Sequence, residues 1–285
     1  MELKFTGRGA MLNPSEGNTA AYFEDEENFF LIDCGEDVTD KLIRMGKLNQ
    51  DKNYYLFITH THSDHIGSIG TLQQYLYWIC GKKLKVVFGA DMKYANDILA
   101  ILNSFGIVQG TYDIVNTRML NDISPMFNRI RYVESNHGDT PLKSASLIIE
   151  TNEGNILYTG DIADTRVIKD FLASNFPDTI DKMYIDTSLN KSPVHLSLEE
   201  LRKTIPIGLS SKVYCMHLNS KELIPEIYKW GFNIVESDKS NLINRDLDSL
   251  NEDELNALES ELKRKLEEIN EIRQSNAGPY FKKTR

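Results

Sequence analysis

Apolar residues with two different spacings alternate along the chain from Leu3 to Trp230. Short runs of about four to eight apolar residues bounded by Gly, Pro, Asn or Asp predict strands, whereas apolar residues three and four positions apart predict helices. Strands are predicted over residues 3–5, 18–24, 28–35, 54–58, 84–88, 114–116, 130–134, 145–151, 155–160, 182–186 and 212–216. Helices are predicted over residues 37–48, 71–79, 92–105, 166–174, 198–205 and 221–230. This alternation indicates an α/β fold with two strand-rich halves.

The pattern changes near Leu247, which predicts a main domain over residues 1–240 and a separate segment over 247–285. In that segment Leu and Ile recur three and four positions apart among many charged residues, as in an amphipathic helix. Acidic residues at its start and basic residues further on suit the helix dipole. Three interpretations stay open: a helix packed against the main domain, a coiled-coil segment that forms a homodimer, or a mobile tail.

Charge and cysteine content narrow the classes of function. The formal net charge of −10 argues against a surface that lies along a nucleic-acid backbone, although a small anionic substrate is compatible with it. The three cysteines, Cys34, Cys80 and Cys215, are widely spaced and lie in apolar runs, which is typical of reduced thiols in a cytosolic protein. No apolar run approaches the roughly 18 residues of a membrane span. We therefore expect a soluble, cytoplasmic protein without a membrane segment.

Half of the six histidines lie in one short stretch, from His60 to His65, directly after the predicted strand 54–58. His60 and His62, two positions apart in a loop, can point toward one cation, while Asp64 and His65 on the next turn face a second position. Neutral imidazole and carboxylate oxygens suit Zn²⁺, and Fe or Mn where carboxylates share the site. The alternative is a polar loop whose histidines face solvent.

The motif His-x-His-x-Asp-His over residues 60–65 resembles the signature of the metallo-β-lactamase superfamily. The resemblance implies an αββα sandwich with a C-terminal helical extension, and two cations held between strand ends. It also implies that Asp33, at the end of the strand 28–35, holds the loop over residues 59–65, here called the metal loop, in position without touching metal. On residues alone, Asp33 is equally well explained as a loop cap.

The resemblance assigns the remaining ligands to later strand ends. Taken alone, His137 is a loop histidine and Asp161 belongs to a common strand-Gly-Asp turn. In the superfamily pattern Asp161 bridges both cations, and His217, after the last core strand, joins the second one. The implied sets are His60, His62, His137 and Asp161 on one ion, with Asp64, His65, Asp161 and His217 on the other.

The last histidine, His195, lies between Val194 and Leu196, shortly after the run Tyr184–Ser188. This arrangement resembles the motif that carries an extra histidine in the ribonuclease Z-like phosphodiesterase branch. The resemblance implies that His195 donates a proton to a leaving oxygen or holds a phosphate oxygen, and that Asp186 orients it. The alternative is that His195 caps the helix beginning at Leu198.

Two bridged cations activate water, so hydrolysis is the expected reaction, with Asp64 also steering the water proton. Only 23 residues separate His137 from Asp161, too few for the protruding arm of tRNA 3′-processing enzymes. Over roughly residues 1–235 the chain resembles the anti-Pycsar phosphodiesterases of phages, which implies hydrolysis of 3′,5′-cyclic nucleotides. A small nucleotide is therefore the expected partner, in the host cytoplasm if a phage encodes the chain.

Other functions stay open at this point. One group comprises hydrolases with the same metal set: a ribonuclease Z-like tRNA 3′-endonuclease with a different gripping surface, a lactonase or a thioester hydrolase. A different class is a protein that keeps the fold and sequesters a nucleotide without chemistry. The complete ligand set argues against this last class, because members of the superfamily that have lost their chemistry usually lack one of the ligands.

Overall fold

The computed structural model describes residues 1–89, 92–138, 140–237 and 263. The unit considered below is residues 1–239. The amphipathic helix expected within 247–285, and the dimer contact expected from it, lie outside the described residues apart from Lys263. No helix among the described residues is long and apolar enough to cross a membrane.

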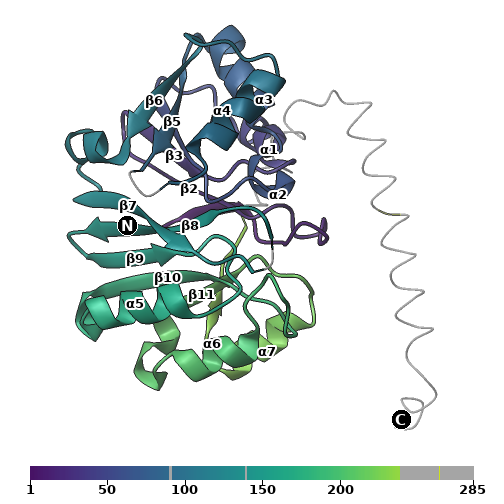
Figure 1. Cartoon of the computed structure of the whole chain (residues 1–285), viewed down its shortest axis with the longest axis vertical. Helices are drawn as coiled ribbons and strands as arrows, with labels where there is room; N and C mark the ends of the chain where they lie inside the picture. Colours follow the sequence, from purple (N-terminus) through teal and green to yellow (C-terminus); the bar gives the residue numbers. More distant parts are fainter. Residues whose placement is uncertain (90–91, 139, 238–262, 264–285) are drawn as a thin grey trace. The chain divides into compact units, whose positions relative to one another are not determined.

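The first sheet, in the part of the chain that the structure describes, has the strand order β1-β2-β3-β4-β5-β6 (Figure 1). The first three strands pair antiparallel, and β3 to β6 pair parallel. The strands are β1 (Lys4–Gly7), β2 (Ala20–Glu24), β3 (Asn28–Ile32), β4 (Asn53–Phe57), β5 (Leu84–Phe88) and β6 (Tyr112–Asn116). The helical elements of this half are α1 (Val38–Arg44), α2 (Ser63–Ile66), α3 (Ile69–Gln74), η1 (Tyr75–Ile79), α4 (Ala95–Ser104) and η2 (Thr117–Asp122).

The second sheet has the order β12-β11-β10-β9-β8-β7. Strands β9 to β12 pair parallel, while β8 is antiparallel to both of its neighbours, so β7 runs in the same direction as β9. The strands are β7 (Arg129–Ser135), β8 (Ser144–Thr151), β9 (Gly154–Tyr158), β10 (Ile180–Asp186), β11 (Val213–Met216) and β12 (Asn233–Ile234). The helical elements are α5 (Arg166–Ser174), η3 (Pro177–Thr179), α6 (Leu198–Thr204), η4 (Ile207–Lys212) and α7 (Leu223–Lys229).

The two sheets pack face to face, and helices cover their outer faces: α1, α3 and α4 lie beside the first sheet and α5, α6 and α7 beside the second (Figure 1). Buried aromatic rings fill the space between the sheets. Phe5 of β1 contacts Tyr184 of β10 with ring centroids 5.4 Å apart, and Phe57 of β4 contacts Tyr132 of β7 at 6.3 Å. The predicted αββα sandwich is confirmed.

Some element boundaries differ from those predicted. The helix expected over 71–79 begins at Ile69 and changes to a π-helical turn from Tyr75 to Ile79. Strand β12 and helix α2 were not anticipated. A strand of two residues has too few positions to show a period, and α2 has only four residues, two of which carry ligand-type side chains in place of an apolar stripe.

Replacement of Tyr132 by phenylalanine is expected to lower the free energy of unfolding by about 1–3 kcal/mol. The buried Tyr132 hydroxyl accepts a hydrogen bond from the backbone N–H of Ile58 at 3.1 Å and donates one to the carbonyl of Val87 at 3.0 Å. The variant leaves the buried Ile58 N–H without this acceptor. Urea unfolding measures the change. Tyr228→Phe is the control, since Tyr228 is 59% exposed, and an equal loss in both variants would contradict the prediction.

Candidate metal centre

All six histidines of the chain lie at one edge of the sandwich, five of them in loops after the carboxyl ends of strands and His65 in helix α2. This convergence follows from topology, because strands that run in the same direction bring their carboxyl ends to one edge. The loops after β4, β7, β9 and β11 and the start of α2 supply candidate ligands, and the end of β10 and its following loop supply the adjoining pair. In chain order these residues are His60, His62, Asp64, His65, His137, Asp161, Asp186, His195 and His217.

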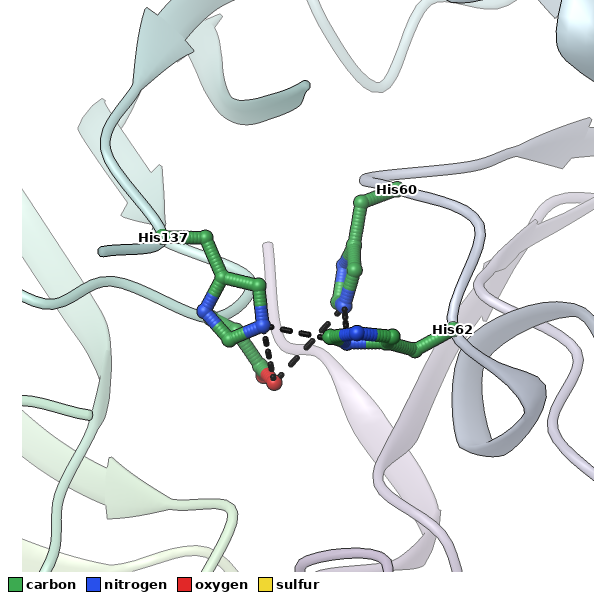
Figure 2. A group of neighbouring side chains, drawn as sticks. His60, His62 and His137 are labelled. Carbon is green, nitrogen blue, oxygen red and sulfur yellow. Dashed lines mark hydrogen bonds and ion pairs between the residues drawn. The ribbon is translucent and has the colours of Figure 1, made fainter. Parts of the chain in front are cut away.

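The first donor group comprises His60, His62, His137 and Asp161, whose ligand atoms lie within 4.8 Å of one another. His62 Nδ1 lies 2.9 Å from His60 Nε2 and 3.0 Å from His137 Nε2. Both Nε2 atoms are 3.7 Å from Asp161 Oδ2. Figure 2 shows the three imidazoles pointing toward a common centre, His60 and His62 from one loop and His137 from the opposite side.

The second donor group comprises Asp64, His65, Asp161 and His217, again with ligand atoms within 4.8 Å of one another. His217 Nε2 lies 3.1 Å from Asp64 Oδ2 and 3.4 Å from Asp161 Oδ1, and His65 Nε2 lies 3.2 Å from Asp161 Oδ1. Asp161 thus belongs to both groups through different oxygens, Oδ2 in the first and Oδ1 in the second. This is the placement that a bridging carboxylate requires.

Buried polar atoms test whether these residues fit metal ions. Asp64 Oδ1, His65 Nε2 and Asp161 Oδ1 are buried and have no hydrogen-bond partner. Such atoms are costly in a protein interior unless something binds them. Imidazole nitrogens and carboxylate oxygens that converge in this way form a donor set for Zn²⁺ or a similar divalent cation. The residues therefore fit metal, and the ligand role of each one stays a prediction.

The electrostatics of the two groups differ. Burial, reinforced by the other histidines, holds the pKa of His60 well below its usual range, so its imidazole is neutral and able to ligate. At His217 burial also opposes the charged form, but Asp161, Asp186 and Asp64 outweigh it and raise its pKa to about 10. The buried carboxylates thus stabilise positive charge at this position, and a divalent cation would supply such charge.

Asp33 holds the metal loop from outside the donor groups. It follows β3 with φ +65°, an unusual backbone conformation for a residue other than glycine. Its Oδ1 accepts a hydrogen bond from the backbone N–H of Thr59 at 2.7 Å, and its Oδ2 accepts one from His65 Nδ1 at 2.9 Å. With Nδ1 donating in this way, His65 presents Nε2 to the second group.

Replacement of Asp33 by asparagine is expected to lower metal affinity about 10–100-fold. The variant removes the charge that fixes the tautomer and orientation of His65. Elemental analysis after dialysis against graded chelator measures the affinity. Asp25→Asn is the matched control, because Asp25 also accepts from backbone N–H groups, those of Glu27 and Asn28, but in a turn away from the donor groups. Equal metal affinity in the Asp33 variant and the unaltered protein would refute the bracing role.

Asp186 and His195 adjoin both groups. Asp186 Oδ2 accepts hydrogen bonds from His195 Nδ1 and from the backbone N–H of Ile162, both at 3.0 Å. The His195 side chain is 22% exposed, whereas that of His217 is 2% exposed. Burial works against a charged His195, but Asp186 more than offsets it and raises its pKa above the usual value. The helix-cap alternative for His195 is wrong, because the side chain of Ser197 caps α6 by accepting from Glu200 N–H.

From the sequence, Gly160 is part of a strand-Gly-Asp turn with no assigned role, although it determines how closely the loops that carry His60 and Asp161 approach. It precedes Asp161 with φ +58°, and a Cβ at this position would lie 2.7 Å from Thr59 Cβ, next to His60. Only glycine accommodates both the backbone conformation and the close packing. The available signal was a glycine directly before a ligand at a strand end.

The sequence model of the family described as Anti-Pycsar protein Apyc1 matches residues 1–235 of the chain. The chain belongs to this family. A relative in Bacillus phage vB_BsuM-Goe3, named Anti-Pycsar protein Apyc1, is 24% identical over 254 residues, which cover 81% of this chain and 95% of the relative. Family membership and the two donor groups together support a metal-dependent hydrolase that uses a divalent cation.

Solved structures show the same fold at low sequence identity. The metallo-β-lactamase fold protein YhfI from Bacillus subtilis matches with a TM-score of 0.64 and 17% identity, covering 82% of this chain and 96% of that one. Human tRNase Z, short form, matches with a TM-score of 0.57 and 15% identity, covering 84% of this chain and 97% of that one. These similarities establish the fold, and the family supplies the closer relationship.

Proposed function

We propose that this protein is a dinuclear-metal phosphodiesterase that hydrolyses 3′,5′-cyclic nucleotides to nucleoside monophosphates. The observation that carries the proposal is the pair of donor groups that share Asp161, with His195 beside them. The relatives are named anti-Pycsar proteins, and the resemblance in sequence to phage phosphodiesterases implies a cyclic-nucleotide substrate. Evasion of Pycsar immunity is the biological role that this activity would serve.

The first donor group would hold one cation and the second the other, with Asp161 between them. When bound, a pair of divalent cations lowers the pKa of water and neutralises charge on a phosphate. Zn²⁺ suits the imidazole-rich first group, and Mn²⁺ or Fe suits a group with more carboxylate oxygens. Asp64 Oδ1 lacks a hydrogen-bond partner. It can accept a hydrogen bond from a water molecule and so orient the water oxygen for attack.

His195 would act on the leaving group, on the side of phosphorus opposite the attacking water. As the water oxygen forms a bond to phosphorus, the bond from phosphorus to one ribose oxygen breaks, and that oxygen needs a proton. His195 donates to Asp186 through Nδ1, so its Nε2 is the atom that protonates the leaving oxygen. Because His195 is more exposed than His217, it can reach a substrate bound over the two groups.

The segment between His137 and Asp161 is compatible with a small substrate, because it is too short for a protruding arm. Strands β8 and β9 account for most of that segment, as a hairpin within the second sheet. No described residue there is available to form an arm that grips tRNA. The net charge of −10 also disfavours a polyanionic partner, while a single phosphodiester presents little charge.

The test compares substrates on one preparation of full-length protein loaded with Zn²⁺ or Mn²⁺. Cyclic nucleotides, a precursor tRNA and an acyl-lactone are incubated separately, and products are resolved by chromatography. The expected product is a nucleoside monophosphate from the cyclic nucleotide. Cleavage of precursor tRNA alone would assign an endonuclease, and binding of cyclic nucleotide without turnover would assign a sequestering protein. Either outcome with metal bound refutes the proposal.

A further inference from the structure

The loop that carries His195 is closed at its base. Ser188 and Ser197 form an isolated bridge, and Ser188 N–H donates to the carbonyl of Leu196 at 2.8 Å, while Leu198 N–H donates to the carbonyl of Ser188 at 2.9 Å. We call residues 188–197 the His195 loop. Its ends are therefore held together, and the position of His195 depends on contacts inside the loop and at its tip.

Inside the loop, one hydroxyl closes the turn that ends at His195. Ser192 Oγ accepts hydrogen bonds from the backbone N–H of Val194 and from the backbone N–H of His195, both at 3.2 Å. The hydroxyl thus binds the backbone of the proposed proton donor itself. Side-chain acceptors of this kind stabilise a turn that the backbone alone does not specify.

The tip of the loop rests on a proposed metal ligand. His137 Nδ1 donates a hydrogen bond to the carbonyl of Val194 at 2.9 Å, while its Nε2 belongs to the first donor group. Gly138, with φ +70°, lies against the carbonyl of Pro193, and a Cβ there would overlap that oxygen. The same imidazole therefore faces the cation position and the residue before His195.

Two independent constraints thus act on His195. Asp186 fixes its ring through Nδ1, and the Ser192 turn together with the His137 contact fixes its backbone. A proton donor must lie within hydrogen-bond reach of the leaving oxygen, and a displacement of about 1 Å can cost on the order of 100-fold in rate. Both constraints are needed to hold Nε2 in place.

We propose that Ser192 is a positioning residue for His195, and that it acts by closing the turn that docks on His137. This inference rests on the proposed phosphodiesterase function and deepens it. Ser192 is in neither donor group, and its hydroxyl binds the backbone N–H of Val194 and His195, so its removal should affect the step that needs the proton from His195. That step matters for a basic leaving group such as a ribose oxygen, and little for p-nitrophenolate, which leaves without a proton.

The experiment measures kcat and KM of Ser192→Ala on a 3′,5′-cyclic nucleotide and on bis(p-nitrophenyl) phosphate, with metal content determined in parallel. We expect kcat on the cyclic nucleotide to fall roughly 10–100-fold with KM unchanged. Turnover of the aryl ester and metal content should stay as in the unaltered protein. Ser192→Thr, which keeps the hydroxyl, should restore turnover of the cyclic nucleotide.

Ser220→Ala is the matched control, because Ser220 Oγ accepts from Glu222 N–H at 3.2 Å in a similar turn outside the His195 loop. Equal losses on both substrates, loss of metal, or no loss on either would overturn the positioning role. If the unaltered protein cleaves only aryl esters, the cyclic-nucleotide assignment fails by itself. Diphenyl phosphate then replaces the cyclic nucleotide, because phenolate is the more basic leaving group, and the same comparison decides the role of Ser192.

Discussion

Asp161→Asn is expected to lower kcat/KM for a 3′,5′-cyclic nucleotide by about 10³-fold or more, because metal ions in such sites supply several kcal/mol of transition-state stabilisation. Asp161 contributes Oδ2 to the first donor group and Oδ1 to the second, so one substitution weakens both. Its pKa is well below the usual range, since the imidazoles of His217 and His65 outweigh the effect of burial. The variant replaces this charged group with a neutral amide of nearly the same shape.

The measurements for Asp161→Asn are steady-state kinetics and elemental analysis of the dialysed protein. Metal content should fall together with activity, which separates loss of metal from a defect in chemistry alone. Asp170→Asn is the control, since Asp170 is an exposed carboxylate on α5. Full metal content and full turnover in the Asp161 variant would contradict the assignment of Asp161 as a carboxylate shared by the two donor groups.

His195→Ala is expected to lower kcat for the cyclic nucleotide by about 10²–10⁴-fold while metal content stays unchanged. The reason is geometric: the His195 ring bonds Asp186 and belongs to neither the first nor the second donor group, but only to a third arrangement of donor atoms that also contains Asp161. Inductively coupled plasma mass spectrometry and steady-state kinetics on the same preparation measure both quantities.

His217→Ala provides the contrast for His195→Ala, because it removes the same kind of side chain from within the second donor group. We expect His217→Ala to lose metal as well as turnover. If His195→Ala loses metal to the same extent, His195 is a ligand and the proton-donor role is wrong. The third arrangement of donor atoms, which joins Asp186 and His195 to Asp161 and His217, would then be the relevant one.

The alternation of strands and helices was predictable because each element carries its own apolar period. Elements without a period were not, as β12 and α2 show. The grouping of donor side chains after β4 was predictable for a different reason, since His60, His62, Asp64 and His65 are close in sequence and must be close in space. The resemblance to a known family then pointed to His137, Asp161 and His217, whose surroundings in the sequence carry little specific signal.

By itself, the sequence determined the α/β order of elements and the concentration of histidines after one strand, because both depend on neighbouring residues. Only the tertiary structure decided that His217, 153 positions from Asp64, brings its Nε2 to 3.1 Å from that carboxylate. It also decided that Asp161 faces the two donor groups with different oxygens and that His137 contacts the His195 loop. These contacts depend on the order and register of strands that are distant in the chain, and no local spacing encodes them.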